Sequence, residues 1–309
     1  MRALLYWGSY LLLPALVLLA TVIRHRAISP WLAGPLVVAL CAGAYARFIE
    51  PQRLTVRTHD VTICGDGLPG TLTAAVASDP QIGVFRHAVD MRRIASRLRA
   101  IDPDFVLIPG DFTYYATPAQ IARAFTPLET LSMPIYATLG NHDLGIPHGE
   151  DVSVPLKSAL ASAGVRVLHP GTAVFEKSGK FVRIVGIEDY EFLEETGGAV
   201  TPLQNGAGMP IIALQHNPTL AKDPRFGGYD LMVSGHTHGG QVLTPFTCAV
   251  TEACDTLRLG YADTPVGKLF VSAGTGMSAL PIRFGVPPRI DVLNLTLDRC
   301  RPTITDKPV

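Results

Sequence analysis

The sequence predicts a layered α/β domain preceded by an N-terminal hairpin of two membrane helices. Two long runs without charged side chains lie within the first 57 residues. Beyond them, short apolar runs of strand length alternate with segments of helical periodicity, as in layered α/β folds. Five of these strand-like runs are followed by side chains of the kinds that bind metals.

The composition already excludes several classes of protein. The chain has 309 residues, of which only 17% are charged, against about a quarter in a typical soluble domain. A disordered or collagen-like chain is therefore excluded. The mean hydropathy of +0.27 indicates that part of the chain is not in water. Five cysteines in a chain of this length do not form a disulfide scaffold.

The net charge is zero, but the charges are unevenly distributed. Residues 1–57 carry six arginines and a single acid, a balance of +5, and residues 58–309 carry −5. General nucleic-acid binding requires a basic body, so we expect no nucleic-acid partner and disfavour a nuclease. A basic leader instead suits the headgroups of membrane lipids, which are expected partners.

The two apolar runs cover about residues 4–23 and 28–46. Each is about long enough to cross a hydrocarbon core of ~30 Å. A cleaved signal peptide is the alternative for the first run, but that run is longer than a signal needs and lacks a clear Ala-x-Ala site. We therefore divide the chain into a membrane hairpin with a basic linker, 1–57, and a second domain, 58–309.

A hairpin of two spans places the N-terminus and the second domain on the same side of the membrane. Four arginines lie on that side and two lie in the connecting loop. By the positive-inside rule, this balance favours a cytoplasmic domain at the inner membrane of the cell. We expect free, mostly well-separated cysteines, in agreement with a reducing compartment, although Cys248 and Cys254 are close enough in sequence to pair in an oxidising one.

The second domain reads as alternating strands and helices. Its apolar runs predict strands at 71–77, 104–108, 135–139, 181–187, 211–214, 230–233, 269–272 and 292–297. Helical spacing predicts helices at 89–100, 118–131 and 155–163. The segment 246–263 has few core signals and is expected to be a long loop, a lid or a membrane-facing flap.

Polar residues with one shared chemistry follow five of the expected strands. They are Ser78-Asp79-Pro80-Gln81, Gly110-Asp111, Gly140-Asn141-His142-Asp143, Gln215-His216-Asn217 and Gly235-His236-Thr237-His238. Ligands bind outside the carboxyl ends of strands in open α/β sheets. Imidazole nitrogens mixed with hard oxygens suit Mn, Fe, Zn or Co. A Gly-Asp pair alone is an ordinary turn, and a lone His216 is a buried, hydrogen-bonded histidine; the ordered set together favours a metal site.

With these motifs, in this order, the sequence resembles the calcineurin-like metallophosphoesterase superfamily. The family pattern is Asp-x-His, Gly-Asp, Gly-Asn-His-Asp/Glu, a lone His and Gly-His-x-His, and the match runs from about Ala74 to Leu297. The hydrophobic N-terminal region and the late segment 278–284 resemble the membrane-associated bacterial branch. The resemblance implies a two-sheet β-sandwich flanked by helices, with two divalent metal ions at the strand ends.

The resemblance also assigns ligands to each of the two ions. One ion would take Asp79, Gln81, Asp111 and His238, and the other would take Asp111, Asn141, His216 and His236. Asp111 would bridge the ions, and His142 would contact the substrate. Gln81 stands where the family usually has His. An amide oxygen ligates more weakly than imidazole, and the exchange favours Mn.

The expected reaction is hydrolysis of a phosphoester or pyrophosphate bond by a metal-activated hydroxide. Three residues form the expected catalytic set. His142 would protonate the leaving oxygen or stabilise the phosphoryl oxygens, and Asn141 would take up part of their charge. Asp143 would either hold His142 or only orient the loop.

Apolar helices would hold this site near the bilayer, so the expected substrate is a lipid-linked or other phosphorylated small molecule, for example UDP-diacylglucosamine. The alternative is a membrane-anchored scaffold of the same fold without activity. Degenerate scaffolds usually lose ligands, whereas all seven ligand positions here carry a side chain able to bind a metal. Two further residues have alternative roles. Arg283 contacts a phosphate or forms an ion pair, and His148 lines the substrate cleft or lies in a surface loop.

Overall fold

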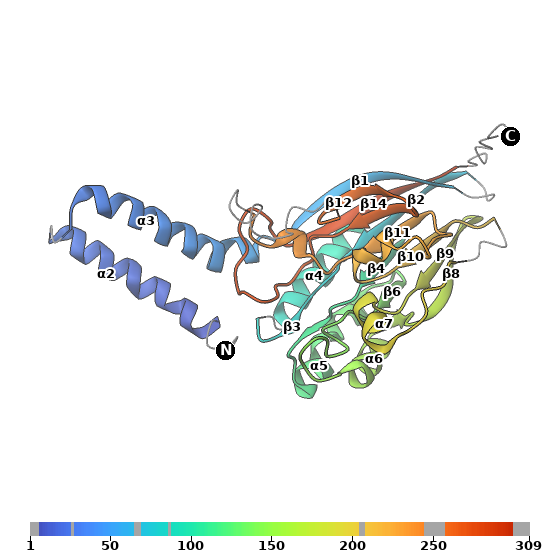
Figure 1. Ribbon diagram of the computed structural model, residues 1–309, viewed down its shortest axis with the longest axis horizontal. Coiled ribbons are helices and arrows are strands. Elements are labelled where there is room, and N and C mark those ends of the chain that lie inside the picture. The colour runs from blue at the N-terminus through green and yellow to red at the C-terminus, as the bar shows by residue number, and fades with distance from the viewer. Residues whose placement is uncertain are drawn as a thin grey trace.

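The computed structural model describes residues 6–25, 28–64, 69–85, 88–203, 208–243 and 257–298. A hairpin of two helices extends from one end of a layered body (Figure 1). The body contains two six-stranded sheets and several helices. The expected fold class, a helix-flanked two-sheet sandwich preceded by two apolar helices, is confirmed.

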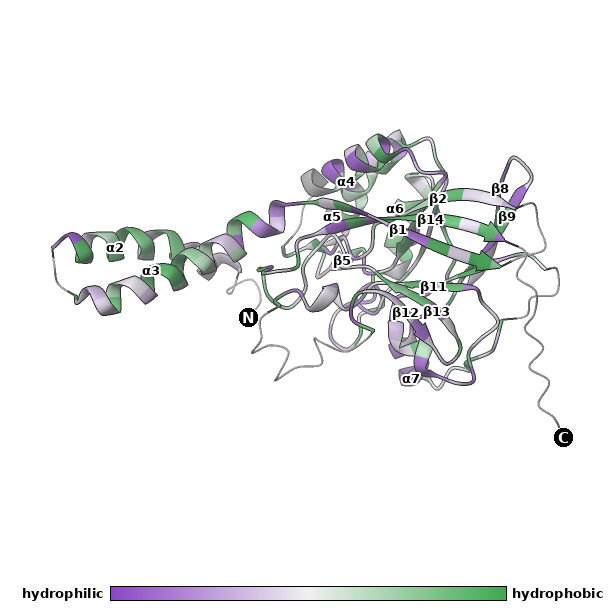
Figure 2. Cartoon of the chain, turned by 90° about the horizontal axis from the view of Figure 1, so that it is seen from above, coloured by the Kyte–Doolittle hydropathy of each residue, from purple (hydrophilic) through white to green (hydrophobic). Residues whose placement is uncertain are grey.

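The hairpin consists of α2 (Leu12–Arg24) and α3 (Pro30–Ala44) with further helical turns next to the body. Apolar helix runs continuously over Tyr6–Arg24 and Pro30–Gln52, which are 19 and 23 residues long. Only 6% and 17% of their most apolar stretches are buried. Figure 2 shows hydrophobic residues along much of both helices. They are long and apolar enough to cross a membrane, and their exposure distinguishes them from the core helices of a soluble domain.

The first sheet joins the two ends of the body's chain. Its strand order is β1-β14-β2-β4-β6-β7, and only the pair β14–β2 is antiparallel. The strands are β1 (Thr55–Cys64), β14 (Arg289–Asp298), β2 (Gly70–Val76), β4 (Phe105–Pro109), β6 (Ile135–Thr138) and β7 (Val165–Val167). Between β2 and β6 the strands run parallel, so their carboxyl ends meet at one edge.

The second sheet has the order β12-β13-β11-β10-β9-β8, parallel in the middle and antiparallel at both edges. Its strands are β12 (Gly260–Thr264), β13 (Gly267–Val271), β11 (Leu231–Ser234), β10 (Ile211–Leu214), β9 (Lys180–Gly186) and β8 (Gly171–Lys177). A small parallel pair, β3 (Ile82–Gly83) and β5 (Thr113–Tyr114), lies beside the loops that follow β2 and β4.

Alternation along the central strands builds three hydrophobic layers. In β4, Phe105 and Leu107 face the other sheet, whereas Val106 and Ile108 face the helices. The same division occurs in β10, where Ile212 and Leu214 point inward. Both faces of these strands are buried, which explains their nearly continuous apolar sequences.

Helices cover the outer face of the first sheet. They are α4 (Ala88–Ile101), α5 (Pro118–Ala124) and α6 (Ser153–Ser162), which contribute to one buried cluster with that sheet. These helices match the three helical segments expected from the sequence, except that the second is shorter and is followed by a 3-10 helix, Thr126–Thr130. A further helix, α7 (Tyr190–Thr196), was not expected.

Two expectations from the sequence need correction. The segment 246–263 is not entirely a loop, because β12 begins at Gly260; residues 244–256, with Cys248 and Cys254, lie outside the described part of the chain. In addition, Cys64 at the end of β1 is disulfide-bonded. The expectation of free cysteines therefore does not hold for Cys64, while Cys41 is free and exposed.

A buried carboxylate joins the two sheets near the hairpin. Asp291 of β14 is fully buried, and its Oδ1 lies 3.0 Å from Nε2 of His59 on β1. Its Oδ2 accepts a hydrogen bond of 2.9 Å from Ser272, which directly follows β13. Arg289 completes an ion pair at 2.6 Å. One side chain thus connects an edge of the first sheet to the second sheet.

We predict that Asp291→Ala lowers the free energy of unfolding by about 3–5 kcal/mol, because it leaves the buried Arg289 without its counter-ion. Urea unfolding of the full chain in detergent, followed by circular dichroism, measures this change. Thr296→Ala, at an exposed position of the same strand, is the control and should change stability by less than about 0.5 kcal/mol. Equal effects of the two substitutions would contradict the prediction.

Candidate metal centre

The expected ligands come from the carboxyl ends of strands in both sheets. Asp79 and Gln81 follow β2, Asp111 follows β4 and Asn141 follows β6. The three histidines, His216, His236 and His238, follow β10 and β11 of the second sheet. The structure brings these seven side chains together where strands of the two sheets end.

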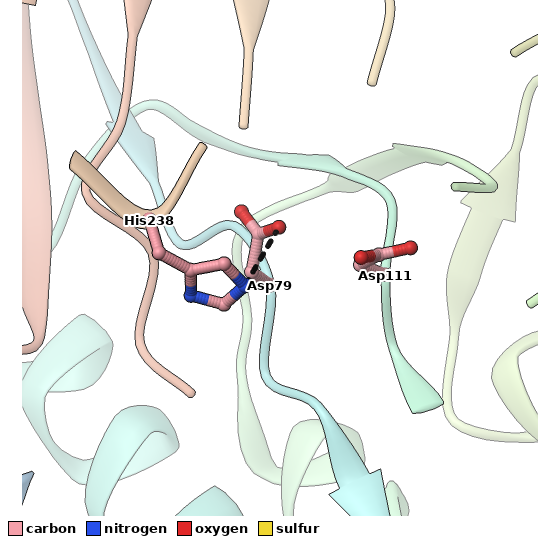
Figure 3. A group of neighbouring side chains, drawn as sticks. All are labelled: Asp79, Asp111 and His238. Carbon is pink, nitrogen blue, oxygen red and sulfur yellow. Dashed lines mark ion pairs between the residues drawn. The ribbon is translucent and has the colours of Figure 1, made fainter. Parts of the chain in front are cut away.

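Asp111 lies at the centre of this group. Its Oδ2 accepts a hydrogen bond of 2.6 Å from Gln81 Nε2 and lies 3.4 Å from His216 Nε2. Its Oδ1 accepts a hydrogen bond of 3.1 Å from the backbone amide of His142. Asp79, Asp111 and His238 also offer ligand atoms within 4.8 Å of one another, and Figure 3 shows Asp79 and His238 facing each other with Asp111 beside them.

The histidines of the second sheet are oriented by specific contacts. His216 Nδ1 lies 2.8 Å from the carbonyl oxygen of Pro109, so this nitrogen carries a proton and Nε2 faces the centre. His236 Nδ1 lies 3.2 Å from that nitrogen. His238 Nε2 lies 3.7 Å from Asp79 Oδ1 and 3.4 Å from Gln81 Nε2.

The backbone around the ligands is unusual. Five ligand residues have positive φ angles, although none is glycine: Asp79, Gln81, Asp111, His236 and His238 have φ between 51° and 69°. Such conformations are uncommon outside glycine and cluster at functional sites, where the surrounding structure holds them. The chain therefore sharply changes direction after each strand and points its side chains into the centre.

Glycines allow the ligand loops to approach one another closely. A Cβ atom at Gly235 would lie 2.0 Å from Ser78 Oγ and 2.2 Å from Asp79 Oδ2. At Gly140 it would lie 2.3 Å from Asp111 Oδ1. These positions therefore require glycine for space.

Burial changes the acid–base properties of the carboxylates. Burial raises the pKa of Asp79 to about 7, with the positive charge of His216 opposing the rise and the negative charge of Asp111 adding to it. Burial also acts on Asp111, but the positive charges of His216 and His142 outweigh it and hold the pKa of Asp111 well below its usual range. Burial and Arg283 lower the pKa of His238 well below its usual range.

The donor set fits divalent cations. Three acceptor atoms of the expected ligands are buried and have no hydrogen-bond partner within the part of the chain that the structure describes: Asp79 Oδ2, Gln81 Oε1 and Asn141 Oδ1. Leaving buried polar atoms unpaired is unfavourable. A cation bound among them would satisfy these oxygens and offset the negative charge of Asp79 and Asp111.

His142 lies at the edge of this centre. Its ring packs edge-on against Tyr114, with centroids 4.9 Å apart. It also lines a cleft of about 320 Å³ together with Thr113, Tyr115 and His148. Of the two readings of His148, the structure supports the cleft residue. A molecule bound in this cleft would contact His142.

Asp143 follows His142 but supports the loop. Its carboxylate accepts hydrogen bonds from the backbone amides of Phe112, Thr113 and Gly140, and from the Thr113 hydroxyl at 2.8 Å. Burial, with the negative charge of Asp111, raises the pKa of Asp143 to about 7. These contacts correspond to the second of its two expected roles, orientation of the loop.

Sequence reasoning missed Glu191 at the start of α7. Its Oε2 accepts a hydrogen bond of 3.0 Å from Asn141 Nδ2, and its Oε1 lies 3.5 Å from His236 Nε2. Glu191 follows the end of β9, as other site residues follow their strands. That pattern was the available signal. Arg283, left open from the sequence, is fully buried and donates to His238 Nδ1 at 3.1 Å.

The fold and this centre define a metal-dependent phosphoester hydrolase. Residues 72–240 match the calcineurin-like phosphoesterase family, to which the chain belongs. It is 26% identical to the uncharacterized metallophosphoesterase YkuE of Bacillus subtilis over 83% of this chain and 92% of YkuE. It is 27% identical to the phosphodiesterase YaeI of Escherichia coli, over 62% of this chain and 70% of YaeI.

The name of a third relative describes it as a transmembrane protein. The chain is 29% identical to a zebrafish (Danio rerio) transmembrane protein with a metallophosphoesterase domain, over 77% of this chain and 56% of that protein. The family uses divalent metal ions, and the group of Asp79, Asp111 and His238 is a possible place for one.

We predict that Gly235→Ala weakens metal binding by roughly 10–100-fold, the range for loss of support behind a ligand, because the added methyl group displaces Asp79. Metal content of the purified protein after dialysis, measured by mass spectrometry, tests this. The control is Gly227→Ala, where the nearest atom would lie 3.7 Å from the new Cβ. Unchanged metal content in the Gly235 variant would refute the role given to this close approach.

Proposed function

We propose that this protein hydrolyses a phosphoester or pyrophosphate bond with two divalent metal ions, on a lipid-linked substrate at the membrane surface. The observation that carries the proposal is the set of unpartnered buried acceptors, Asp79 Oδ2, Gln81 Oε1 and Asn141 Oδ1, beside His142 and its cleft. The mixed nitrogen and oxygen donors support Mn, Fe, Zn or Co, and Gln81 favours Mn.

The proposal divides the seven residues between two ions. Asp79, Gln81, Asp111 and His238 would hold one ion, and Asp111, Asn141, His216 and His236 would hold the other. When bound, the ions would activate a water molecule and offset charge on the phosphoryl oxygens. The contacts of Asp111 with residues of both sets, Gln81 and His216, support its place as the bridge.

Residues of the chain would supply the remaining catalytic groups. His142, whose ring faces the cleft, would donate a proton to the leaving oxygen. Its backbone amide is fixed by Asp111, and its ring is fixed by Tyr114. Asp143 would keep the loop in position through its hydrogen bonds to backbone amides. Asn141 would contribute to stabilising the phosphoryl oxygens.

The junction between the hairpin and the body supports a substrate at the membrane surface. The ring of Tyr6 stacks on Phe85 with centroids 5.6 Å apart, Phe85 lies 5.5 Å from Tyr114, and Tyr114 lies 4.9 Å from His142. A continuous row of rings thus leads from the first apolar helix to His142. A bilayer around the hairpin would place the phosphate-binding centre close to the headgroups, where a UDP-diacylglucosamine-like molecule exposes its pyrophosphate.

We predict that the full chain hydrolyses bis-p-nitrophenyl phosphate, p-nitrophenyl phosphate or a lipid pyrophosphate when supplied with Mn, Zn or Fe. Of these, the lipid pyrophosphate in detergent micelles or vesicles should give the largest kcat/KM. Rates with and without each metal test the proposal. Inactivity toward all three, whatever metal is added, would favour the alternative of a membrane-anchored scaffold.

Substitutions separate the proposed roles. His142→Ala should reduce kcat by about 10²–10⁴-fold while the metal content stays unchanged, because it removes the proton donor and leaves the ligands in place. Asp111→Asn should abolish turnover and reduce metal content, because it removes the proposed bridge. Parallel measurements of rate and bound metal test both statements. Loss of metal from the His142 variant would overturn its assignment.

We also propose that the hairpin spans the inner membrane with the body in the cytoplasm. The arginine balance between the two sides supports this orientation, whereas the disulfide at Cys64 is an opposing observation, since disulfides persist in oxidising compartments. A C-terminal fusion to green fluorescent protein should fluoresce, and a fusion to alkaline phosphatase should be inactive. The reverse pair of results would place the body outside the cytoplasm.

A further inference from the structure

The two proposed metal positions differ in what lies behind their ligands. Around the position formed by Asn141, His216 and His236, the outer contacts are acceptors. Pro109 O accepts from His216 Nδ1 at 2.8 Å, and Glu191 contacts both Asn141 Nδ2 and His236 Nε2. Outer acceptors fix the orientation of a ligating imidazole and raise its basicity, and their loss typically weakens metal binding 10–100-fold.

Glu191 orients two ligands at once. Its Oε2 accepts a hydrogen bond of 3.0 Å from Asn141 Nδ2, so the Asn141 oxygen is directed away from Glu191. Among the described residues, that oxygen has no hydrogen-bond partner. Because its Oε1 lies 3.5 Å from His236 Nε2, the other nitrogen of that ring faces His216. Its carboxylate adds negative charge beside this position and is only about one-third exposed.

Around the other position, the outer contact is a cation. The guanidinium of Arg283 donates to His238 Nδ1 at 3.1 Å and is completely buried. It is held there by hydrogen bonds to the carbonyl oxygens of Ala273, Gly276 and Val286. A neutral ring that accepts a hydrogen bond at Nδ1 carries its proton on Nε2, so that in this arrangement Nε2 presents no lone pair to an ion. A fixed positive charge this close also repels a bound cation.

The direct ligands add to the difference. Gln81 offers an amide oxygen where an imidazole would bind more tightly. Its amide nitrogen, and not its oxygen, contacts Asp111, donating a hydrogen bond of 2.6 Å to Oδ2. The position with Asp79, Gln81 and His238 therefore has a weaker direct ligand and a cation behind its histidine.

We infer that the two ions bind with unequal affinity: the position formed by Asn141, His216 and His236 holds its ion tightly, and the position formed by Asp79, Gln81 and His238 holds an exchangeable ion. This inference rests on the proposed two-metal function. It makes the occupancy of the second ion, and hence the active form, dependent on the free concentration of the divalent cation.

Equilibrium dialysis of the full chain in detergent against Mn²⁺ tests the inference without any assay of activity. Binding should occur in two steps of one ion each, separated by at least about 10-fold in free Mn²⁺. Gln81→His should shift the weaker step by about 10-fold or more toward tighter binding and leave the tighter step unchanged. Glu191→Ala should weaken the tighter step by roughly 10–100-fold.

Controls make each outcome decisive. Glu195→Ala, an exposed position on the same helix, should leave both steps unchanged. If Glu191→Ala does not fold, Glu191→Gln removes the charge and should weaken the same step to a smaller extent. Two equal steps, or a Gln81→His variant that moves the tighter step, would overturn the inference while leaving the proposed function intact. Absence of any bound Mn²⁺ would contradict both.

Discussion

The concentration of buried acidic groups where the strands end is the constraint on which the site depends. Asp79, Asp111 and Asp143 are all buried within loops that contact one another. Burying several carboxylates together is unfavourable unless protons, cations or hydrogen bonds compensate. Asp143 is compensated by backbone amides, whereas Asp79 keeps an oxygen without a partner. The fold therefore concentrates negative charge at one place, and bound cations would compensate it.

Meeting that demand requires backbone conformations that most sequences avoid. Left-handed conformations at Asp79, Asp111 and His238 turn the side chains inward, and glycine at position 235 leaves space for the neighbouring loop. The strain is supported by two sheets whose strands are packed on both faces. Rigid packing below the loops and strained geometry within them thus belong to one arrangement.

Much of this arrangement could be predicted from the sequence, and the failures have physical reasons. Central strands such as β4 and β10 were found because strands buried on both faces are continuously apolar. The edge strands β1, β8 and β12 were missed because their outward positions are polar, as at Arg57 or Glu176, and resemble loops. The candidate metal ligands could be selected because all of them follow strands within a few residues, and the structure brings them close together.

Contacts between distant segments could not be predicted in the same way. The pairing of Glu191 with Asn141 and His236 depends on where α7 lies relative to loops from both sheets. Arg283 was ambiguous, because an isolated arginine in a sequence does not reveal whether its partners are phosphates, carboxylates or carbonyl oxygens. The row of rings from Tyr6 to His142 joins four segments, and no local pattern marks it.

Arg283 also shows why the hairpin and the site form one unit. Its backbone amide donates to the carbonyl oxygen of Ala46 at 3.0 Å, while its side chain reaches His238. The next residue, Phe284, packs edge-on against Tyr45 with centroids 6.3 Å apart. A displacement of the hairpin would therefore pull on the loop that fixes His238, just as it would pull on Phe85 through Tyr6. The apolar helices are built into the support of the site, so that the position of the hairpin and the geometry of the candidate ligands are set by the same contacts.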